Sequence, residues 1–219
     1  FEGAEAAARV SPAEQVGGDF YQLFRLPGGR VGVMLGDVSL HGFPSALIMT
    51  LTMSAAGIYA RELESPAQVL RGLDDALREE LETTEMFLTV FYGVLDPTAG
   101  RLVYSNAGHP HAFVIHADGG LDRLTATDPP LGFAGPDSYA EEVVPWDPRQ
   151  DLLLLFTDGL SDILASATRG DGEERVLDTV IALRHAPVRM IVEELFALTA
   201  DAHPPIQGDD RTALLVRTP

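Results

Sequence analysis

Hydrophobic and polar positions in the first third of the chain change from a strand-like to a helix-like pattern. Apolar residues cluster between Leu23 and Asp37 on both sides of a Pro27-Gly28-Gly29 turn, which predicts two short strands in a hairpin. From Pro44 onward the segment ALIMTLTMSAAGIYAREL lacks strand alternation and consists mostly of good helix formers, so a helix is expected. Apolar residues recur on one face of a second predicted helix, from about Pro66 to Glu82.

The middle of the chain consists of strand-like runs separated by short turns. Consecutive strands joined in this way predict an antiparallel sheet. The segment from Asp128 to Tyr139 is rich in Pro, Gly and Asp and is expected to be a loop. The predicted strands are MFLTVFYGVLD, RLVYSNAG, HAFVIHA and the segment Leu121 to Leu124.

The last third opens with DLLLLFT, a run so apolar that it predicts a strand buried on both faces. Strands and helices are grouped along the chain rather than strictly alternating. This grouping argues against a doubly wound parallel sheet and predicts an α+β layered fold. The remaining predicted elements are helices over Leu160 to Ala167, Arg175 to Leu183 and Pro187 to Ala202, and a closing strand over Thr212 to Arg217.

Length and charge limit the classes of function. A chain of 219 residues is long enough for one core, so residues 1–219 are expected to form a single domain, and a start at Phe1 suggests trimming from a longer protein. The formal net charge of -18 disfavours binding to nucleic acid and to anionic membranes. No apolar run appears long enough for a membrane span, and the chain has no cysteine. A cytoplasmic location is therefore the default expectation.

Four short segments each place an aspartate beside a run of strand-like apolar residues. Each aspartate alone has an ordinary explanation as a turn or helix-capping residue. Four acid-bearing turns next to core strands are harder to explain in this way, because converging carboxylates from separate segments form sites for hard divalent cations. The adjacent pair is the least favourable without a cation, since neighbouring like charges repel. The acids are Asp19, Asp37, Asp158 and the pair Asp209-Asp210.

The motifs VGGDFYQ, GDVSLHG, FLTVFYG, SNAGHP, FTDGL and GDDRT occur in this order from Val16 to Thr212. As an ordered set they resemble the metal-dependent type 2C protein serine/threonine phosphatases, in particular the bacterial branch named after stage II sporulation protein E. The resemblance implies two packed antiparallel sheets flanked by helices, an α/β/β/α sandwich. It also implies a centre of two divalent cations, Mn²⁺ or Mg²⁺.

The resemblance also implies roles for individual residues. The aspartate of GDVS, here Asp37, bridges the two metals, and Val38 offers its backbone carbonyl. Further carboxylates come from Asp158 of the TDG motif and from Asp209, the first acid of the DD pair. Asp19 matches an acid at the first metal.

The histidines in these motifs each have more than one candidate role. His41, in GDVSLHG, is a candidate for protonating the leaving alkoxide. The alternatives are that water does so, or that His41 packs against or caps the following helix. For Asn106 and His109, in SNAGHP, hydrogen bonding within a turn is the preferred interpretation.

Three positions depart from the family pattern. Gln22 stands where an acid often follows the GGDFY stretch. Leu40 replaces the usual glycine of the GDVSGHG motif, and Asp162 lies where the pair threonine-glutamate is frequent. None of them removes a matched ligand. Leu40 is expected to reshape its turn and to alter the affinity for metal.

The predicted function is metal-dependent hydrolysis of phosphoserine or phosphothreonine on a protein by a metal-activated water. The resemblance suggests a phosphorylated anti-sigma-factor antagonist as the substrate. Two alternatives are a metal-dependent phosphatase for small molecules and a catalytically silent protein-binding module. The apolar helices between Pro44 and Glu82 could support a homodimer, although packing onto the core explains them better.

Overall fold

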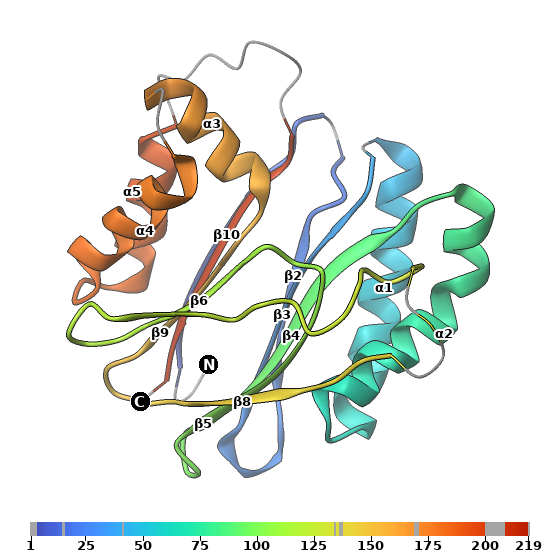
Figure 1. Cartoon of the computed structure of the whole chain (residues 1–219), viewed down its shortest axis with the longest axis horizontal. Helices are drawn as coiled ribbons and strands as arrows, with labels where there is room; N and C mark the ends of the chain where they lie inside the picture. Colours follow the sequence, from blue (N-terminus) through green and yellow to red (C-terminus); the bar gives the residue numbers. More distant parts are fainter. Residues whose placement is uncertain are drawn as a thin grey trace. The chain divides into compact units, whose positions relative to one another are not determined.

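The computed structural model describes residues 4–14, 16–40, 42–133, 135, 138–168, 171–199 and 209–218. Contacts between Cα atoms divide the chain into two compact units, each built on its own five-stranded sheet (Figure 1). Unit 1 contains residues 1–13, 111–124 and 148–219, and unit 2 contains residues 14–110 and 125–147. The assignment of the whole chain to a single phosphatase domain stays a prediction.

The sheet of unit 2 has the strand order β2-β3-β4-β5-β8, and each neighbouring pair is antiparallel. A short 3-10 turn over Pro27–Gly29 joins the first two strands, and Gly28 and Gly29 there take positive φ values of 76° and 74°. The predicted hairpin is therefore confirmed. The strands are β2 (Phe20–Arg25), β3 (Val31–Val38), β4 (Leu88–Asp96), β5 (Arg101–Ala107) and β8 (Glu142–Pro145).

Two long helices, α1 (Phe43–Glu62) and α2 (Pro66–Thr84), complete unit 2 (Figure 1). Ser65 caps α2, because its side chain accepts a hydrogen bond from the Gln68 amide. The apolar stripe of α2 is buried and packs with residues of β4 in one hydrophobic cluster. The buried stripe includes Val69, Leu70, Leu73, Leu77 and Leu81.

Helix α1 buries mainly small or polar side chains, such as Ser45, Thr52 and Ala56. Its opposite side leaves Phe43 and Leu47 more than half exposed. By length and composition alone α1 could cross a membrane, a test that a core helix of a soluble protein also passes. The sequence-based statement that no apolar segment reaches this length is therefore wrong for α1.

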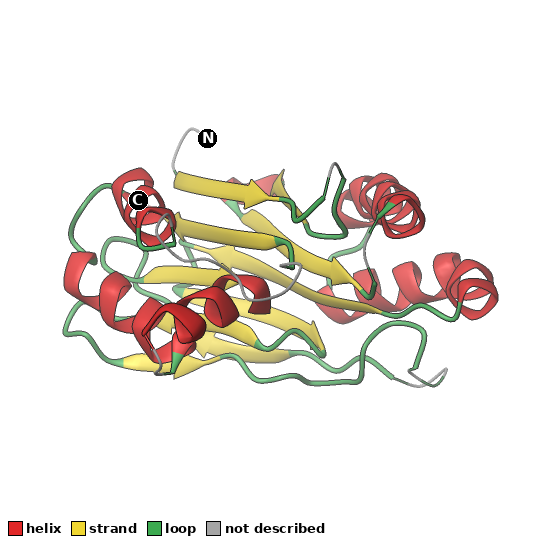
Figure 2. Cartoon of the chain, turned by 90° about the horizontal axis from the view of Figure 1, so that it is seen from above, coloured by secondary structure: helices red, strands yellow, loops and turns green. Residues whose placement is uncertain are grey.

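The sheet of unit 1 has the strand order β1-β10-β9-β6-β7, again with every neighbouring pair antiparallel. Helices α3, α4 and α5 pack on this sheet through buried apolar side chains. Figure 2 draws the helices of the chain in red and the strands in yellow. The strands are β1 (Glu5–Ser11), β6 (His111–Ile115), β7 (Leu121–Arg123), β9 (Leu152–Phe156) and β10 (Arg211–Arg217). The helices are α3 (Asp158–Thr168), α4 (Gly172–Leu183) and α5 (Val188–Ala197).

The predicted α+β class, with two antiparallel sheets flanked by helices, is confirmed. Two strands, β1 and β8, were not predicted. Helices α3 and α4 begin two and three residues earlier than expected, since Asp158 belongs to the first turn of α3 and Asp171 caps α4. The end of the helix predicted over 187–202 lies partly outside the described residues.

Candidate metal centre

Asp19 and Asp37 lie side by side at one end of the sheet of unit 2. The register pairs Phe20 with Gly36, so the residue before β2 lies beside the end of β3. Asp19 is buried and Asp37 is partly exposed. We call Asp19, Asp37 and the Val38 carbonyl the first acid cluster.

Gly18 brings the two segments of the first acid cluster together. A Cβ atom at residue 18 would lie 2.8 Å from the Val38 carbonyl oxygen and 3.4 Å from Oδ1 of Asp37. Any side chain here would therefore press on the two oxygen atoms that the resemblance assigns to metal. Glycine leaves this position open, which fits a bound cation.

The turn after Val38 is fixed by Ser39. Its amide donates to the Phe87 carbonyl at 2.9 Å, and its hydroxyl accepts from the Phe87 amide at 2.9 Å. Leu40 has a φ of 68°, so it keeps the left-handed conformation that a glycine adopts more easily. The departure at Leu40 thus leaves a glycine-like backbone but adds strain. His41 lies outside the described residues, and its catalytic role stays a prediction.

Asp158 and Asp209 lie on neighbouring segments of unit 1. The Thr157 amide donates to the Thr212 carbonyl at 3.1 Å, and the Thr212 amide donates to the Thr157 hydroxyl oxygen at 2.9 Å. These bonds join the end of β9 to the start of β10. Both Asp158 and Asp209 are exposed.

Gly159 allows this close approach. A Cβ atom at residue 159 would lie 2.1 Å from the Asp210 carbonyl oxygen and 3.2 Å from the Asp209 carbonyl carbon. Close packing against the Asp210 backbone therefore requires glycine at this position of the TDG motif, which the sequence alone does not show. We call Asp158, Asp209 and Asp210 the second acid cluster.

The adjacent acids Asp209 and Asp210 differ in their surroundings. Asp210 is 4% exposed, and its Oδ1 accepts a hydrogen bond of 2.8 Å from the Ala13 amide. Asp209 is exposed, and its Oδ1 accepts from the Asp210 amide at 2.8 Å. Asp210 thus holds the N-terminal segment, which agrees with the choice of Asp209 as the ligand.

The predicted donors are four carboxylates and one backbone carbonyl, so every ligand atom is oxygen. This donor set fits Mg²⁺ or Mn²⁺ and excludes a soft-metal site. Among the residues that the structure describes, no group of three Asp, Glu or His side chains forms a ready-made ion site. The metal-ligating residues therefore stay predictions, each supported by the local geometry of its own cluster.

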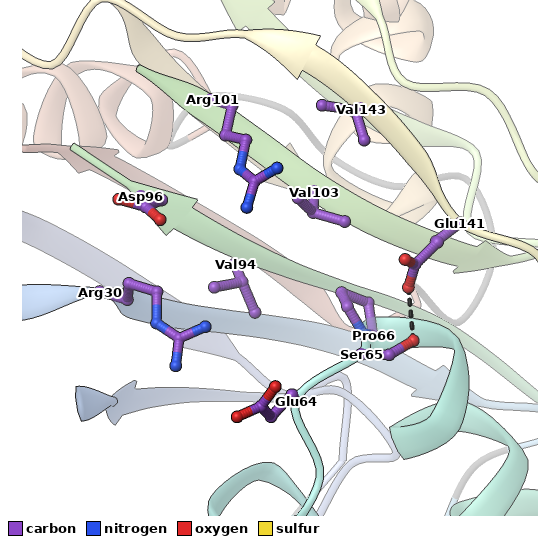
Figure 3. A pocket seen from close by; sticks show the side chains of 10 residues that line it. All are labelled: Arg30, Glu64, Ser65, Pro66, Val94, Asp96, Arg101, Val103, Glu141 and Val143. Atoms are coloured by element: carbon purple, nitrogen blue, oxygen red, sulfur yellow. Dashed lines mark hydrogen bonds between the residues drawn. The ribbon is translucent and has the colours of Figure 1, made fainter. Parts of the chain in front are cut away.

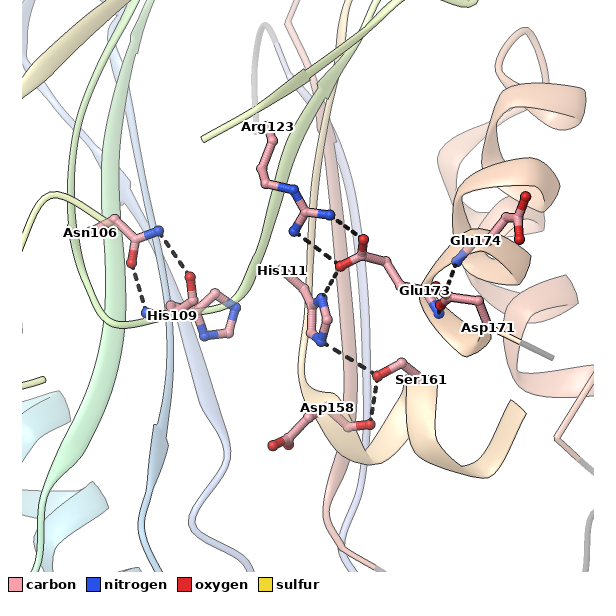
Figure 4. Close-up of polar contacts among 9 residues, drawn as sticks. All are labelled: Asn106, His109, His111, Arg123, Asp158, Ser161, Asp171, Glu173 and Glu174. Carbon is pink, nitrogen blue, oxygen red and sulfur yellow. Dashed lines mark hydrogen bonds and ion pairs between the residues drawn. The ribbon is translucent and has the colours of Figure 1, made fainter. Parts of the chain in front are cut away.

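A polar network behind Asp158 was not predicted (Figure 4). The Ser161 hydroxyl donates to the Asp158 carbonyl at 2.8 Å and lies 3.4 Å from Nε2 of His111. Nδ1 of His111 lies 2.7 Å from Oε2 of Glu173. The two terminal nitrogens of Arg123 donate to the same carboxylate, one to each oxygen. Burial alone would raise the pKa of Glu173, but the hydrogen bonds from Arg123 and His111 outweigh it and hold this pKa below its usual value.

Asn106 and His109 form a turn in unit 2, also drawn in Figure 4. Oδ1 of Asn106 accepts from the His109 amide at 2.8 Å, and Nδ2 donates to the His109 carbonyl at 2.9 Å. Both side chains are buried. The predicted role in turn hydrogen bonding is confirmed for the Asn106 side chain, and His109 takes part in it through its backbone amide and carbonyl.

The structure also places the other two departures from the family pattern, Gln22 and Asp162. The Gln22 amide donates to the Met53 carbonyl of α1 at 3.1 Å, so this side chain ties β2 to α1. Asp162 is exposed on α3, one turn after Asp158.

Two cavities lie away from the acid clusters. One, of about 300 Å³ in unit 2, is lined by Arg30 and Arg101, by the acids Glu64 and Asp96, and by valines, as Figure 3 shows. It is at the opposite end of the sheet from Asp37, because Asp96 pairs with Arg101 at the far end of β4. A second cavity of about 300 Å³ in unit 1 is lined by Ala117, Arg149, Gln150, Arg184, His185 and Arg217.

Solved structures define the class of this fold. The SiaA-PP2C domain of Pseudomonas aeruginosa matches with a TM-score of 0.83 at 24% identity, over 98% of this chain and 86% of that chain. The catalytic domain of the serine/threonine protein phosphatase PstP, solved with two manganese ions, matches with a TM-score of 0.70 at 17% identity, over 98% of each chain. The fold is that of the type 2C protein phosphatases.

The family described as Stage II sporulation protein E (SpoIIE) matches residues 27–219. The chain belongs to this family, as the ordered motifs predicted. The phosphoserine phosphatase RsbP of Bacillus subtilis is 32% identical over 160 residues, which cover 70% of this chain and 39% of RsbP. Protein IcfG of Synechocystis is 26% identical over 235 residues, which cover 95% of this chain and 37% of IcfG. The chain thus spans less than two fifths of either relative.

Proposed function

We propose that this chain hydrolyses phosphoserine or phosphothreonine on a protein substrate with the help of two divalent cations, Mn²⁺ or Mg²⁺. The observation that carries the proposal is the pair of acid clusters, each opened by a glycine whose Cβ would collide with the acid-bearing backbone. Membership of the SpoIIE family supports it. RsbP is named a phosphoserine phosphatase, and PstP was solved with two manganese ions.

Five residues would hold the cations. Asp37 would contact both, Val38 would offer its carbonyl oxygen, and Asp19 would act at the first cation. Asp158 and Asp209 would add the carboxylates of unit 1. When bound, the cations lower the pKa of a water molecule toward neutrality and neutralise the charge that develops on the phosphoryl oxygens.

The chain's own residues position groups and do not attack the phosphorus atom. No cysteine is present, and the Ser161 hydroxyl donates its proton to the Asp158 carbonyl, so neither supplies a nucleophile. Water attacks the phosphorus in line with the seryl or threonyl oxygen, the P–O bond to that oxygen breaks, and the alcohol and inorganic phosphate leave. His41 is the proposed proton donor to the leaving oxygen.

The proposed substrate is a phosphorylated anti-sigma-factor antagonist, in a bacterial stress or developmental pathway. This proposal follows the family resemblance and is consistent with the formal charge of -18, which disfavours nucleic acid. A cytoplasmic location and a possible homodimer also stay predictions.

The test is turnover of a phosphoserine peptide and of a phosphorylated antagonist protein with Mn²⁺, Mg²⁺ or EDTA. Asp37→Asn and Asp158→Asn should each lose most of the activity with unchanged circular dichroism, since a charged ligand is removed while the shape remains. Asp162→Asn is the matched control, because Asp162 is an exposed acid of α3 outside the cluster. Sugar phosphates and nucleotides, assayed in parallel, test the small-molecule alternative. Manganese-dependent turnover that survives in both cluster variants would contradict the assignment.

A further inference from the structure

We propose that His111 is a positioning residue: held by Glu173, it orients the Ser161 hydroxyl, and Ser161 fixes the backbone of Asp158 for cation binding. This inference rests on the proposed function, because it concerns the affinity of the second acid cluster for a divalent cation. Three separate segments of unit 1 meet in this network: His111 begins β6, Ser161 belongs to α3, and Glu173 belongs to α4 (Figure 4).

The contacts of Ser161 place its hydroxyl between the Asp158 backbone and His111. Ser161 has one hydroxyl proton, and its shorter contact, 2.8 Å, is to the Asp158 carbonyl, which can only accept. The same hydroxyl oxygen lies 3.4 Å from Nε2 of His111. Nδ1 of His111 lies 2.7 Å from a carboxylate oxygen of Glu173. The His111 ring therefore lies between Glu173 and Ser161, and its orientation sets the polar surroundings of the Ser161 hydroxyl.

Packing keeps the His111 ring in place. It is stacked on Phe156, with ring centroids 4.3 Å apart and an interplanar angle of 7°. The register of the sheet pairs these two residues across β6 and β9. Arg123 fixes the other end of the network, since its guanidinium lies 4.6 Å above the Phe113 ring while both terminal nitrogens contact Glu173. A ring held on one face and at both nitrogens is a rigid support for Ser161.

The first turn of α3 is where such support affects metal binding. Asp158 is exposed, and its Oδ1 accepts a hydrogen bond of 3.0 Å from the Gly159 amide, while the Ser161 hydroxyl contacts the Asp158 carbonyl. The next residue, Gly159, lies against the backbone of Asp210. A small rotation of this turn would change the direction of the Asp158 carboxylate relative to Asp209. Partners behind the ligands typically change metal affinity or activity by about 10- to 100-fold when removed.

A purely structural reading assigns His111 a different role. In that reading the contact between Nδ1 and Glu173 ties β6 to the start of α4, and the contact to Ser161 is incidental. The two interpretations predict opposite orders of Mn²⁺ affinity for two variants at residue 111. Asn at residue 111 keeps an amide group near the position of Nδ1, whereas Gln places one near the position of Nε2. Both variants lose the stacking on Phe156 equally.

The experiment measures Mn²⁺ binding by titration calorimetry on the whole chain, together with the melting temperature in EDTA. We expect Ser161→Ala to bind Mn²⁺ about tenfold more weakly while Ser161→Thr, which keeps the hydroxyl, restores the affinity. We also expect His111→Asn to weaken Mn²⁺ binding more than His111→Gln does. The melting temperatures in EDTA should not follow this order, because the effect acts on the ligand and not on the fold.

Two results would overturn the inference alone: wild-type Mn²⁺ affinity in Ser161→Ala, or weaker binding in His111→Gln than in His111→Asn. A wild-type chain that binds no Mn²⁺ would overturn the proposed function and this inference together. The wild-type titration therefore distinguishes the two failures.

Discussion

Replacing Gly159 by alanine adds one methyl group at the closest backbone approach in the second acid cluster. Its Cβ would lie 2.1 Å from the Asp210 carbonyl oxygen and 3.0 Å from the Asp210 carbonyl carbon. Both atoms belong to the backbone, so no side chain can turn away. Real Cβ contacts stay above 3.0 Å, and the two segments would have to separate by about 0.9 Å.

This separation has two expected consequences. Inserting a methyl group into a closely packed site costs about 1–3 kcal/mol, which lowers the melting temperature of a chain of this size by about 2–12 °C. A displacement of about 1 Å in a catalytic group can cost about 100-fold in rate. We therefore expect Mn²⁺-dependent turnover of a phosphoserine peptide to fall by about two orders of magnitude, with weaker Mn²⁺ binding.

Gly57→Ala is the matched control. Gly57 lies inside α1, and no atom lies within 4 Å of the position where its Cβ would be. Alanine there should stabilise the chain by about 0.5–1 kcal/mol and leave turnover unchanged. Melting curves, Mn²⁺ calorimetry and peptide turnover on the two variants decide the matter. If Gly159→Ala kept wild-type Mn²⁺ affinity and turnover, the steric explanation of the TDG glycine would be refuted.

Three further changes have expected outcomes. Leu40→Gly should raise stability by about 1 kcal/mol by relieving the left-handed strain at φ 68°, and an unchanged or lower melting temperature would contradict this. Ser65→Ala should cost about 1 kcal/mol through loss of the α2 cap, with turnover unchanged. Burial alone would lower the pKa of His116, but its hydrogen bonds to the carboxylates of Asp151 and Asp122 outweigh burial and raise this pKa. The charged side chain therefore stabilises the fold below pH 6.5, the usual pKa, and this contribution is lost as pH rises through the raised pKa. His116→Gln should therefore lower the melting temperature more at pH 6 than at pH 9, and an equal loss at both would refute the pairing.

Local patterns predicted the elements whose sequence permits only one arrangement. The run LLLLF is apolar at every position, and all five residues of β9 are buried. Strand β1 gave no such signal, because its sequence EAAARVS is rich in alanine and favours a helix. It is a strand because all seven residues pair with β10, about 200 positions later in the chain. Strand β8 is short, largely exposed and ends in Pro145, so its pattern resembles a loop.

The acid clusters and the network of His111, Ser161 and Glu173 also differ in how far a local sequence motif indicates them. Asp37 lies near the end of β3 and Asp158 comes shortly after β9, each inside a short motif that made it a candidate from the sequence. His111, Ser161 and Glu173 come from three segments with no shared spacing, and only the fold brings them together. The family resemblance selected Asp209 rather than Asp210 as the ligand, but the difference in burial between the two acids comes from packing alone.

Two glycines, more than the acids, determine where the clusters can form. Aspartates in turns are common, but a carboxylate becomes a ligand only if a second acid-bearing segment can come close enough. Gly18 allows this at the end of β3, and Gly159 allows it at the start of β10, where hydrogen bonds through Thr157 and Thr212 hold the strands in register. An Asp→Asn change removes charge and keeps this backbone, whereas Gly→Ala keeps the charge and moves the backbone. If the backbone sets the cation affinity, both kinds of change must weaken binding, and for different reasons: the Asp→Asn change leaves the melting temperature in EDTA near that of the wild type, and the Gly→Ala change lowers it.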